Sequence, residues 1–79
     1  MSLVHKRITD LIEDSGVSQE ALADAIGVTR ATINRFVNGH YDLKLHNAIE
    51  IAKFFNISLD YLAGLIDEPI SLSDRNKKQ

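Results

Sequence analysis

The chain has 79 residues, 44% of them hydrophobic, which allows one small domain with its own core and excludes a second domain. It contains no cysteine, so disulfides, thiolate metal sites and a cysteine nucleophile are excluded. The formal net charge is -2, and no apolar run is long enough to cross a bilayer or to form a secretory signal, so we expect a soluble, cytoplasmic protein.

The first two predicted helices show apolar residues at helical spacing, each series followed by a glycine. Gly16 and Gly27 stand where a helix can end in the left-handed conformation that glycine adopts without strain. Ser18 offers a side-chain oxygen that can cap the second helix. The expected inward residues are Val4, Ile8, Leu11 and Ile12 in the first helix, and Leu22, Ala25 and Ile26 in the second.

Three more helices follow from the same criteria. Thr29 is predicted to cap the third helix and Gly39 to end it, while Ser58 caps the fifth. Asn56 is predicted to close the fourth, because asparagine tolerates the left-handed conformation next best after glycine. The expected inward residues are Ile33 and Phe36 in the third helix, Leu45, Ala48, Ile49, Ala52 and Phe55 in the fourth, and Leu59, Leu62 and Leu65 in the fifth.

The absence of strand-like alternation completes the prediction of an all-α fold. Because the five predicted helices lie within residues 1–66, we expect these residues to form a single compact domain. Residues 67–79 are mostly polar and contain the one proline of the chain, so we expect them to form a polar C-terminal tail.

Positive charge is concentrated in the middle of the sequence. Residues 29–44 hold three Lys or Arg against one Asp or Glu, whereas residues 1–28 hold two against five and residues 45–79 hold four against five. A short basic strip on an acidic body can meet phosphates while the remaining surface is repelled by them. The charge pattern therefore allows a nucleic-acid surface only around residues 29–44.

The second and third predicted helices form a pair with a sharp turn between them. Only residues 27–29 separate them, and the small Ala23 lets the two helices cross closely. This pattern predicts a helix-turn-helix over residues 19–38. The side chains expected to face outward from the third helix suit the major groove of DNA, and they are Arg30, Ala31, Asn34, Arg35 and Asn38.

The sequence resembles the Cro/CI-type helix-turn-helix family, also called lambda-repressor-like or XRE. The resemblance rests on Ser-Gln-Glu-Ala-Leu-Ala at 18–23, Gly-Val-Thr-Arg-Ala-Thr-Ile at 27–33, Asn-Gly at 38–39 and the segment 51–62, and it covers residues 4–66. It implies a compact five-helix domain that binds double-stranded DNA as a homodimer on a near-palindromic operator. It also implies a transcriptional regulator, commonly a repressor, and we expect no cofactor.

The same resemblance implies roles for individual residues. The positions that reach base edges are Arg30, Ala31, Asn34 and Arg35, and those expected at the DNA backbone are Gln19, Thr29, Thr32, Asn38, His40 and Lys44. Arginine favours guanine and Ala31 can accept a thymine methyl group, so we expect at least one G·C pair in the site. The family often has Pro-Ser where this chain has Leu43 and Lys44, so Asp42 caps the fourth helix or nothing does.

Other classes of site have weaker support. The three histidines, His5, His40 and His46, lack the close spacing of metal ligands, so we expect them on the surface and no metal bound. No base stands near a nucleophile, so we expect no enzyme.

Spare apolar residues near the C-terminus leave two interpretations open. They either widen the core or form a dimer patch, and they are Leu65, Ile66, Ile70 and Leu72. Together with the acidic surface, they also motivate an alternative function, that of an antitoxin or adaptor whose main partner is another protein.

Overall fold

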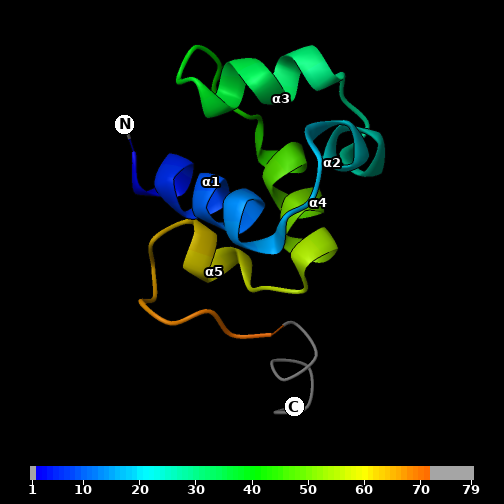
Figure 1. The fold of residues 1–79 in the computed structure, drawn as a ribbon. Helices are drawn as coiled ribbons and strands as arrows, with labels where there is room; N and C mark the ends of the chain where they lie inside the picture. The colour runs from blue at the N-terminus through cyan, green and yellow to red at the C-terminus, as the bar shows by residue number, and fades with distance from the viewer. Residues whose placement is uncertain (1, 72–79) are drawn as a thin grey trace.

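The chain folds into five helices and no strand over residues 2–71, the part that the computed structural model describes (Figure 1). The helices are α1 (Leu3–Ser15), α2 (Gln19–Ile26), α3 (Arg30–Val37), α4 (Leu45–Phe55) and α5 (Leu59–Leu62). Helix α3 lies across one end of the molecule, and α5 lies at the other (Figure 1). None of the helices within residues 2–71 combines the length and the apolar character needed to cross a membrane.

Side-chain hydroxyls determine where most of the helices begin. In four helices the residue before the first turn accepts a backbone N–H: Ser2 from His5, Ser18 from Ala21, Thr29 from Thr32 and Ser58 from Tyr61. The three predicted caps are therefore confirmed, and Ser2 adds a fourth. Helix α4 starts after Lys44 without a side-chain cap, so Asp42 does not cap it.

Left-handed residues end three of the helices where the sequence predicts them. Gly16 (φ 72°), Gly27 (φ 80°) and Asn56 (φ 53°) follow α1, α2 and α4. Helix α3 ends one residue earlier than expected, because Asn38 is its C-terminal cap and the left-handed Gly39 comes next. At Gly27 the chain turns tightly, since the N–H groups of Gly27 and Val28 both donate to the Ala23 carbonyl.

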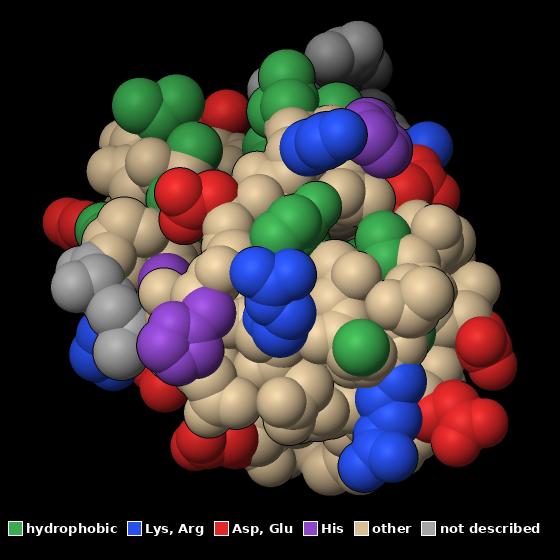
Figure 2. All heavy atoms as spheres, turned by 90° about the horizontal axis from the view of Figure 1, so that it is seen from above, with side chains coloured by type: hydrophobic (Ala, Val, Ile, Leu, Met, Phe, Trp, Pro, Cys, Tyr) green, Lys and Arg blue, Asp and Glu red, His purple; other side chains and the backbone are tan. Residues whose placement is uncertain are grey.

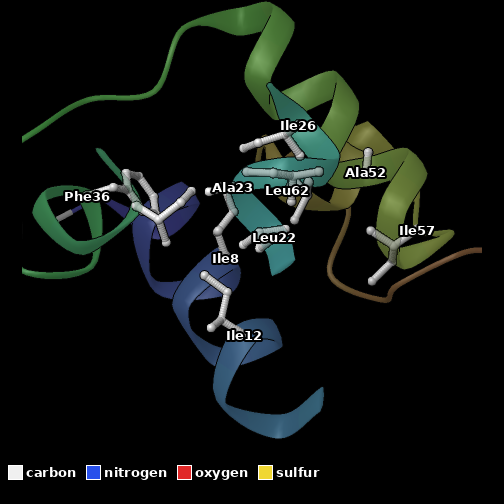
Figure 3. Close-up of a cluster of buried hydrophobic side chains, with 11 residues drawn as sticks. Ile8, Ile12, Leu22, Ala23, Ile26, Phe36, Ala52, Ile57 and Leu62 are labelled. Atoms are coloured by element: carbon white, nitrogen blue, oxygen red, sulfur yellow. The ribbon is translucent and has the colours of Figure 1, made fainter. Parts of the chain in front are cut away.

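The core takes apolar side chains from all five helices and from the turn between α4 and α5 (Figure 3). It consists of Ile8, Ile12, Leu22, Ala23, Ile26, Ile33, Phe36, Ile51, Ala52, Ile57 and Leu62. Ile8, Leu22, Ile33, Ile51 and Leu62 are fully buried. Because α2 and α3 each contribute such residues, the helix pair is fixed to the rest of the domain rather than held by its turn alone.

Three predictions of the inward faces are wrong. In α2 the buried alanine is Ala23, which packs in the core, whereas Ala25 is exposed. In α4 the buried residues are Asn47, Ile51 and Ala52, whereas the predicted Leu45 is 70% exposed. Helix α5 ends at Leu62, and Leu65 lies beyond it, 75% exposed.

The segment after α5 folds back along the body of the domain. The Arg7 side chain is 12% exposed, donates to the carbonyls of Tyr61 and Ile66, and lies 4.1 Å from the centroid of the Tyr61 ring. Further along, the Ser58 N–H donates to the Ile70 carbonyl at 2.7 Å. The first residues of the predicted tail therefore contact the turn between α4 and α5, and residues 72–79 lie outside the described part.

Candidate nucleic-acid interface

One face of α3 is buried and thereby orients the other face outward. Ile33 is fully buried and Phe36 is 4% exposed, and both pack in the core with Leu22 and Ile26 of α2. These two residues, three apart, lie on one side of the helix. The opposite side of α3 is consequently directed away from the domain, where a ligand as large as a duplex has access.

The outward face carries the four predicted base-reading residues. Arg30, Ala31, Asn34 and Arg35 are all exposed. The first three line an open hollow of about 370 Å³ on the surface of the helix. Its lining combines the donors of an arginine, the amide of an asparagine and the methyl group of an alanine, which are groups that can contact base edges.

The two arginines lie at opposite ends of this face and have different surroundings. Arg30, in the first turn of α3, makes no hydrogen bond or ion pair with any residue in the range 2–71. Arg35, near the end of the helix, donates to the His40 carbonyl at 3.4 Å and lies 6.0 Å from the centroid of the Tyr41 ring. Arg30 is free to reach a partner, whereas Arg35 is directed toward the loop after α3.

Side-chain amides connect α2 to the outward face of α3. Nδ2 of Asn34 donates to Oε1 of Gln19 at 3.4 Å, and Oδ1 of Asn34 accepts from Nδ2 of Asn38 at 3.2 Å. Gln19 is the first residue of α2 and Asn38 is the C-terminal cap of α3. The structure thus brings three of the predicted site residues together in one hydrogen-bonded row, the amide row.

The remaining predicted backbone-contacting residues surround α3. At its start the hydroxyl oxygens of Thr29 and Thr32 lie 3.0 Å apart, and the Thr29 hydroxyl also accepts the Thr32 N–H. Beyond its end, His40 and Lys44 are exposed on the loop that leads to α4. The two threonines lie at the start of α3, and His40 and Lys44 follow its end along the chain.

The positive charges available to a ligand coincide with this surface. Outside residues 29–44, Lys6 pairs with Asp10 at 2.7 Å and Lys53 pairs with Glu50 at 3.3 Å, and the guanidinium of Arg7, which also donates to carbonyls, lies 3.9 Å from Asp67. The hydrogen bond to Asp10 also raises the pKa of Lys6 above its ordinary value. Among residues 2–71, the basic side chains with no acidic partner are therefore Arg30, Arg35 and Lys44.

Figure 2 views the molecule from the α3 side. Basic side chains cross the middle of this face, and acidic side chains lie mostly toward its rim. The acidic body of the chain therefore leaves a narrow positive strip, as the distribution of charge along the sequence predicts.

His5 is a contact that the sequence analysis missed. Its Nε2 lies 2.7 Å from the carbonyl oxygen of Phe36, and the centroids of the two rings lie 4.9 Å apart with a tilt of 44°, so this histidine connects α1 to the end of α3. The prediction of a surface histidine is wrong here. Its spacing of three and seven residues from Ile8 and Ile12 places it on the buried stripe and could have indicated this. No group of three potential metal ligands occurs within residues 2–71.

The described residues of the predicted dimer patch differ in exposure and do not form one exposed apolar surface. Leu65 is exposed, Ile66 and Ile70 are half-buried, and Leu72 lies outside the described residues. A separate apolar groove of about 340 Å³ is lined by Val4, Leu43, Leu45, Ala48, Leu59, Leu62 and Ala63. Leu3 is 48% exposed and its side chain lies beside Gly64. The groove is therefore formed by residues of α1, α4 and α5, together with Leu43 and Ala63.

Comparison with known proteins gives a consistent result. A model of the helix-turn-helix family matches residues 8–62. An uncharacterized HTH-type transcriptional regulator of Archaeoglobus fulgidus is 36% identical over 64 residues, which cover 81% of this chain and 91% of the relative. Another, from Methanocaldococcus jannaschii, is 43% identical over 44 residues, 56% of this chain and 67% of that protein.

Among solved structures, the P22 c2 repressor protein in complex with a synthetic operator is similar, with a TM-score of 0.67. The match covers 78% of this chain and 94% of the repressor chain, at 24% sequence identity. At this identity the likeness bears on the fold. It confirms the predicted all-α, five-helix, lambda-repressor-like architecture.

Proposed function

Because the chain belongs to the Cro/CI-type helix-turn-helix family, we propose that it is a transcriptional regulator that binds double-stranded DNA through α3. The observation that carries this proposal is the position of the three unpaired basic side chains. All of them lie within residues 29–44: Arg30 and Arg35 are exposed on α3, and Lys44 is exposed on the loop that follows it. Arginine and lysine side chains that lack an acidic partner are those that can neutralise phosphates and release counterions.

The dimensions and chemistry of α3 suit the major groove. A helix with its side chains is about 10–12 Å across, similar to the width of that groove in B-DNA, about 12 Å. In the proposed complex Arg30 and Arg35 contact guanine, Ala31 contacts a thymine methyl group and Asn34 contacts a base edge. The backbone contacts come from Gln19, Thr29, Thr32, Asn38, His40 and Lys44.

The proposal includes a homodimer on a near-palindromic operator. Two copies related by a twofold axis place their recognition helices about 34 Å apart, one turn of DNA. Leu45 is 70% exposed and lines the apolar groove, and the exposed Leu3 lies beside Gly64, which follows the lining residue Ala63; these side chains supply a surface that a second copy can bury. This surface takes the place of the patch centred on Ile66 and Ile70, whose side chains are already half-buried.

A repressor is the regulatory role that we propose. The similar P22 c2 protein is a repressor in complex with an operator. A chain of this kind acts by occupying its site, and it needs neither catalysis nor a cofactor.

Selection from random duplexes tests the proposed function. The purified chain is expected to enrich a near-palindromic site that contains at least one G·C pair per half, and its affinity is expected to fall as salt rises. If no duplex is enriched and binding does not depend on salt, DNA is not the partner. The alternative role, an antitoxin or adaptor that covers its apolar groove with another protein, would then be favoured.

A further inference from the structure

Asn34 differs from the other outward residues of α3 because both atoms of its amide group are engaged. Its Nδ2 donates to Gln19 of α2 and its Oδ1 accepts from Asn38, one turn further along α3. Asn34 therefore lies in the centre of the amide row, between two elements that the core fixes relative to each other.

The two hydrogen bonds of the amide row favour one orientation of the Asn34 carboxamide, with Nδ2 toward Gln19 and Oδ1 toward Asn38. A carboxamide rotated by 180° exchanges its oxygen and its nitrogen, and a free asparagine on a helix surface adopts both states. Here the oxygen of Gln19 requires an N–H donor, and the amino group of Asn38 requires an oxygen acceptor. With its neighbours oriented in this way, the flipped state of Asn34 places like groups against each other at both contacts.

The amide retains enough hydrogen-bonding capacity to bind a ligand. It has two N–H donors and two acceptor lone pairs, and the row uses one of each. One donor and one acceptor remain on the same planar group. Adenine presents the complementary pair in the major groove, the N7 acceptor and the N6 amino donor, whereas guanine presents two acceptors, N7 and O6.

We propose that Asn34 reads an adenine in the DNA site, and that Gln19 and Asn38 are positioning residues that hold its amide in the orientation for reading. The inference rests on the proposed function, since it assigns a base to one residue of that interface. The hollow beside Asn34, lined by Arg30 and Ala31, leaves room for the base pair.

The two bonds of the row are long and exposed in the free protein, so each contributes little in water. A duplex placed over α3 excludes water and lowers the local dielectric constant, which strengthens hydrogen bonds between amides. The row therefore has its effect in the complex, where the choice between bases is made.

The first experiment measures preference at single positions of the selected site. Dissociation constants are compared for duplexes in which each adenine is replaced in turn. The parent chain is expected to lose affinity on the order of tenfold at one adenine per half-site. In Asn34→Ala and Asn34→Asp, which both lack the amide N–H, that loss is expected to disappear while the preference for guanine remains.

The second experiment separates orientation from phosphate contact at Gln19. Gln19→Glu retains the oxygen that accepts from Asn34, whereas Gln19→Leu removes it. The added negative charge of Gln19→Glu weakens binding to all duplexes. The ratio of the dissociation constants for the duplex without the adenine and the duplex with it is nevertheless expected to stay near that of the parent. In Gln19→Leu the ratio is expected to fall to that of Asn34→Ala.

A third variant changes the other side of the row. Asn38→Asp replaces the donor with an acceptor and is expected to lower the adenine ratio as well, because the new carboxylate and the Asn34 oxygen repel each other in the parent orientation. Circular dichroism checks that each variant retains the helix content of the parent.

Several outcomes would overturn the inference. They are a site without a required adenine, an Asn34→Ala variant that keeps the adenine preference, and a Gln19→Leu variant that weakens all duplexes without changing the ratio. A parent chain that binds no duplex would overturn the proposed function itself, so the two failures are distinguishable.

Discussion

At the scale of single residues, the exposed face of α3 combines a free arginine with groups that are already bonded. Arg30 has no partner within residues 2–71, whereas Arg35 and Asn34 bond to neighbouring groups. A contact between Arg30 and guanine therefore costs no bond within the domain. Arg35 has to leave the His40 carbonyl before it can reach a base.

The first prediction concerns Arg30. Arg30→Ala is expected to weaken binding to the selected site by about 1–3 kcal/mol and to relax the preference for one guanine. Its effect on random duplexes should be much smaller. Titration of both duplex types with the variant measures the difference. Equal losses on the two would assign Arg30 to a phosphate instead of a base.

Lys44 provides the second prediction, since it is exposed and has no acidic partner among residues 2–71. Lys44→Ala is expected to weaken binding to specific and random duplexes alike and to reduce the slope of log K against log salt by about one. Affinities measured over a range of salt concentrations give this slope. Lys53→Ala is the matched control, because Lys53 already pairs with Glu50 and its loss should leave the slope unchanged.

Residue patterns along the chain were sufficient to predict the exposed face of α3 but not what its side chains contact. Ile33 and Phe36 fix the phase of that helix, so the outward residues follow from helical spacing alone. The bond between Gln19 and Asn34 joins residues 15 apart and depends on how closely α2 and α3 cross. The contact between His5 and Phe36 spans 31 residues and depends in the same way on tertiary packing.

At the scale of helices, local signals located most boundaries, and they failed where packing decides. The caps at Ser18, Thr29 and Ser58 and the left-handed Asn56 are where the sequence predicts them. For α4 the sequence analysis predicted the wrong buried face. Its apolar residues occupy more than one face, so spacing alone could not decide which of them the other helices cover.

The third prediction tests the observed phase of α4. Ile51→Ala is expected to lower the free energy of unfolding by about 2–5 kcal/mol, since Ile51 is fully buried. Leu45→Ala, in the same helix but 70% exposed in the single chain, is expected to change the free energy of unfolding of the monomer by less than about 0.5 kcal/mol. Chemical denaturation of the two variants compares them directly. If Leu45→Ala lowered the free energy of unfolding more than Ile51→Ala, the buried face of α4 would be the one predicted from the sequence.

At the scale of the whole molecule, the proposed DNA-binding surface and the proposed dimer surface belong to different parts of the fold. The first is on α3, and the second is the apolar groove between α1, α4 and α5 with its exposed leucines. Since a second copy would cover the groove and leave α3 exposed, a dimer can present two recognition helices to one duplex.

The fourth prediction separates the two surfaces. Leu45→Glu places a charge in the apolar groove and is expected to convert the dimer to a monomer in sedimentation analysis. The selected palindrome should then be bound more weakly, whereas a single half-site should be bound as by the parent. Retention of the dimer by this variant would exclude the groove as its interface.

The most direct test of the central claim is a titration of the isotope-labelled chain with the selected duplex, followed residue by residue through the amide signals in NMR. We predict that the largest changes fall on residues 29–44 and on Gln19, with much smaller changes on the acidic remainder of the surface. Changes confined to the apolar groove around Leu45 and Leu65, or no changes on α3, would contradict the account.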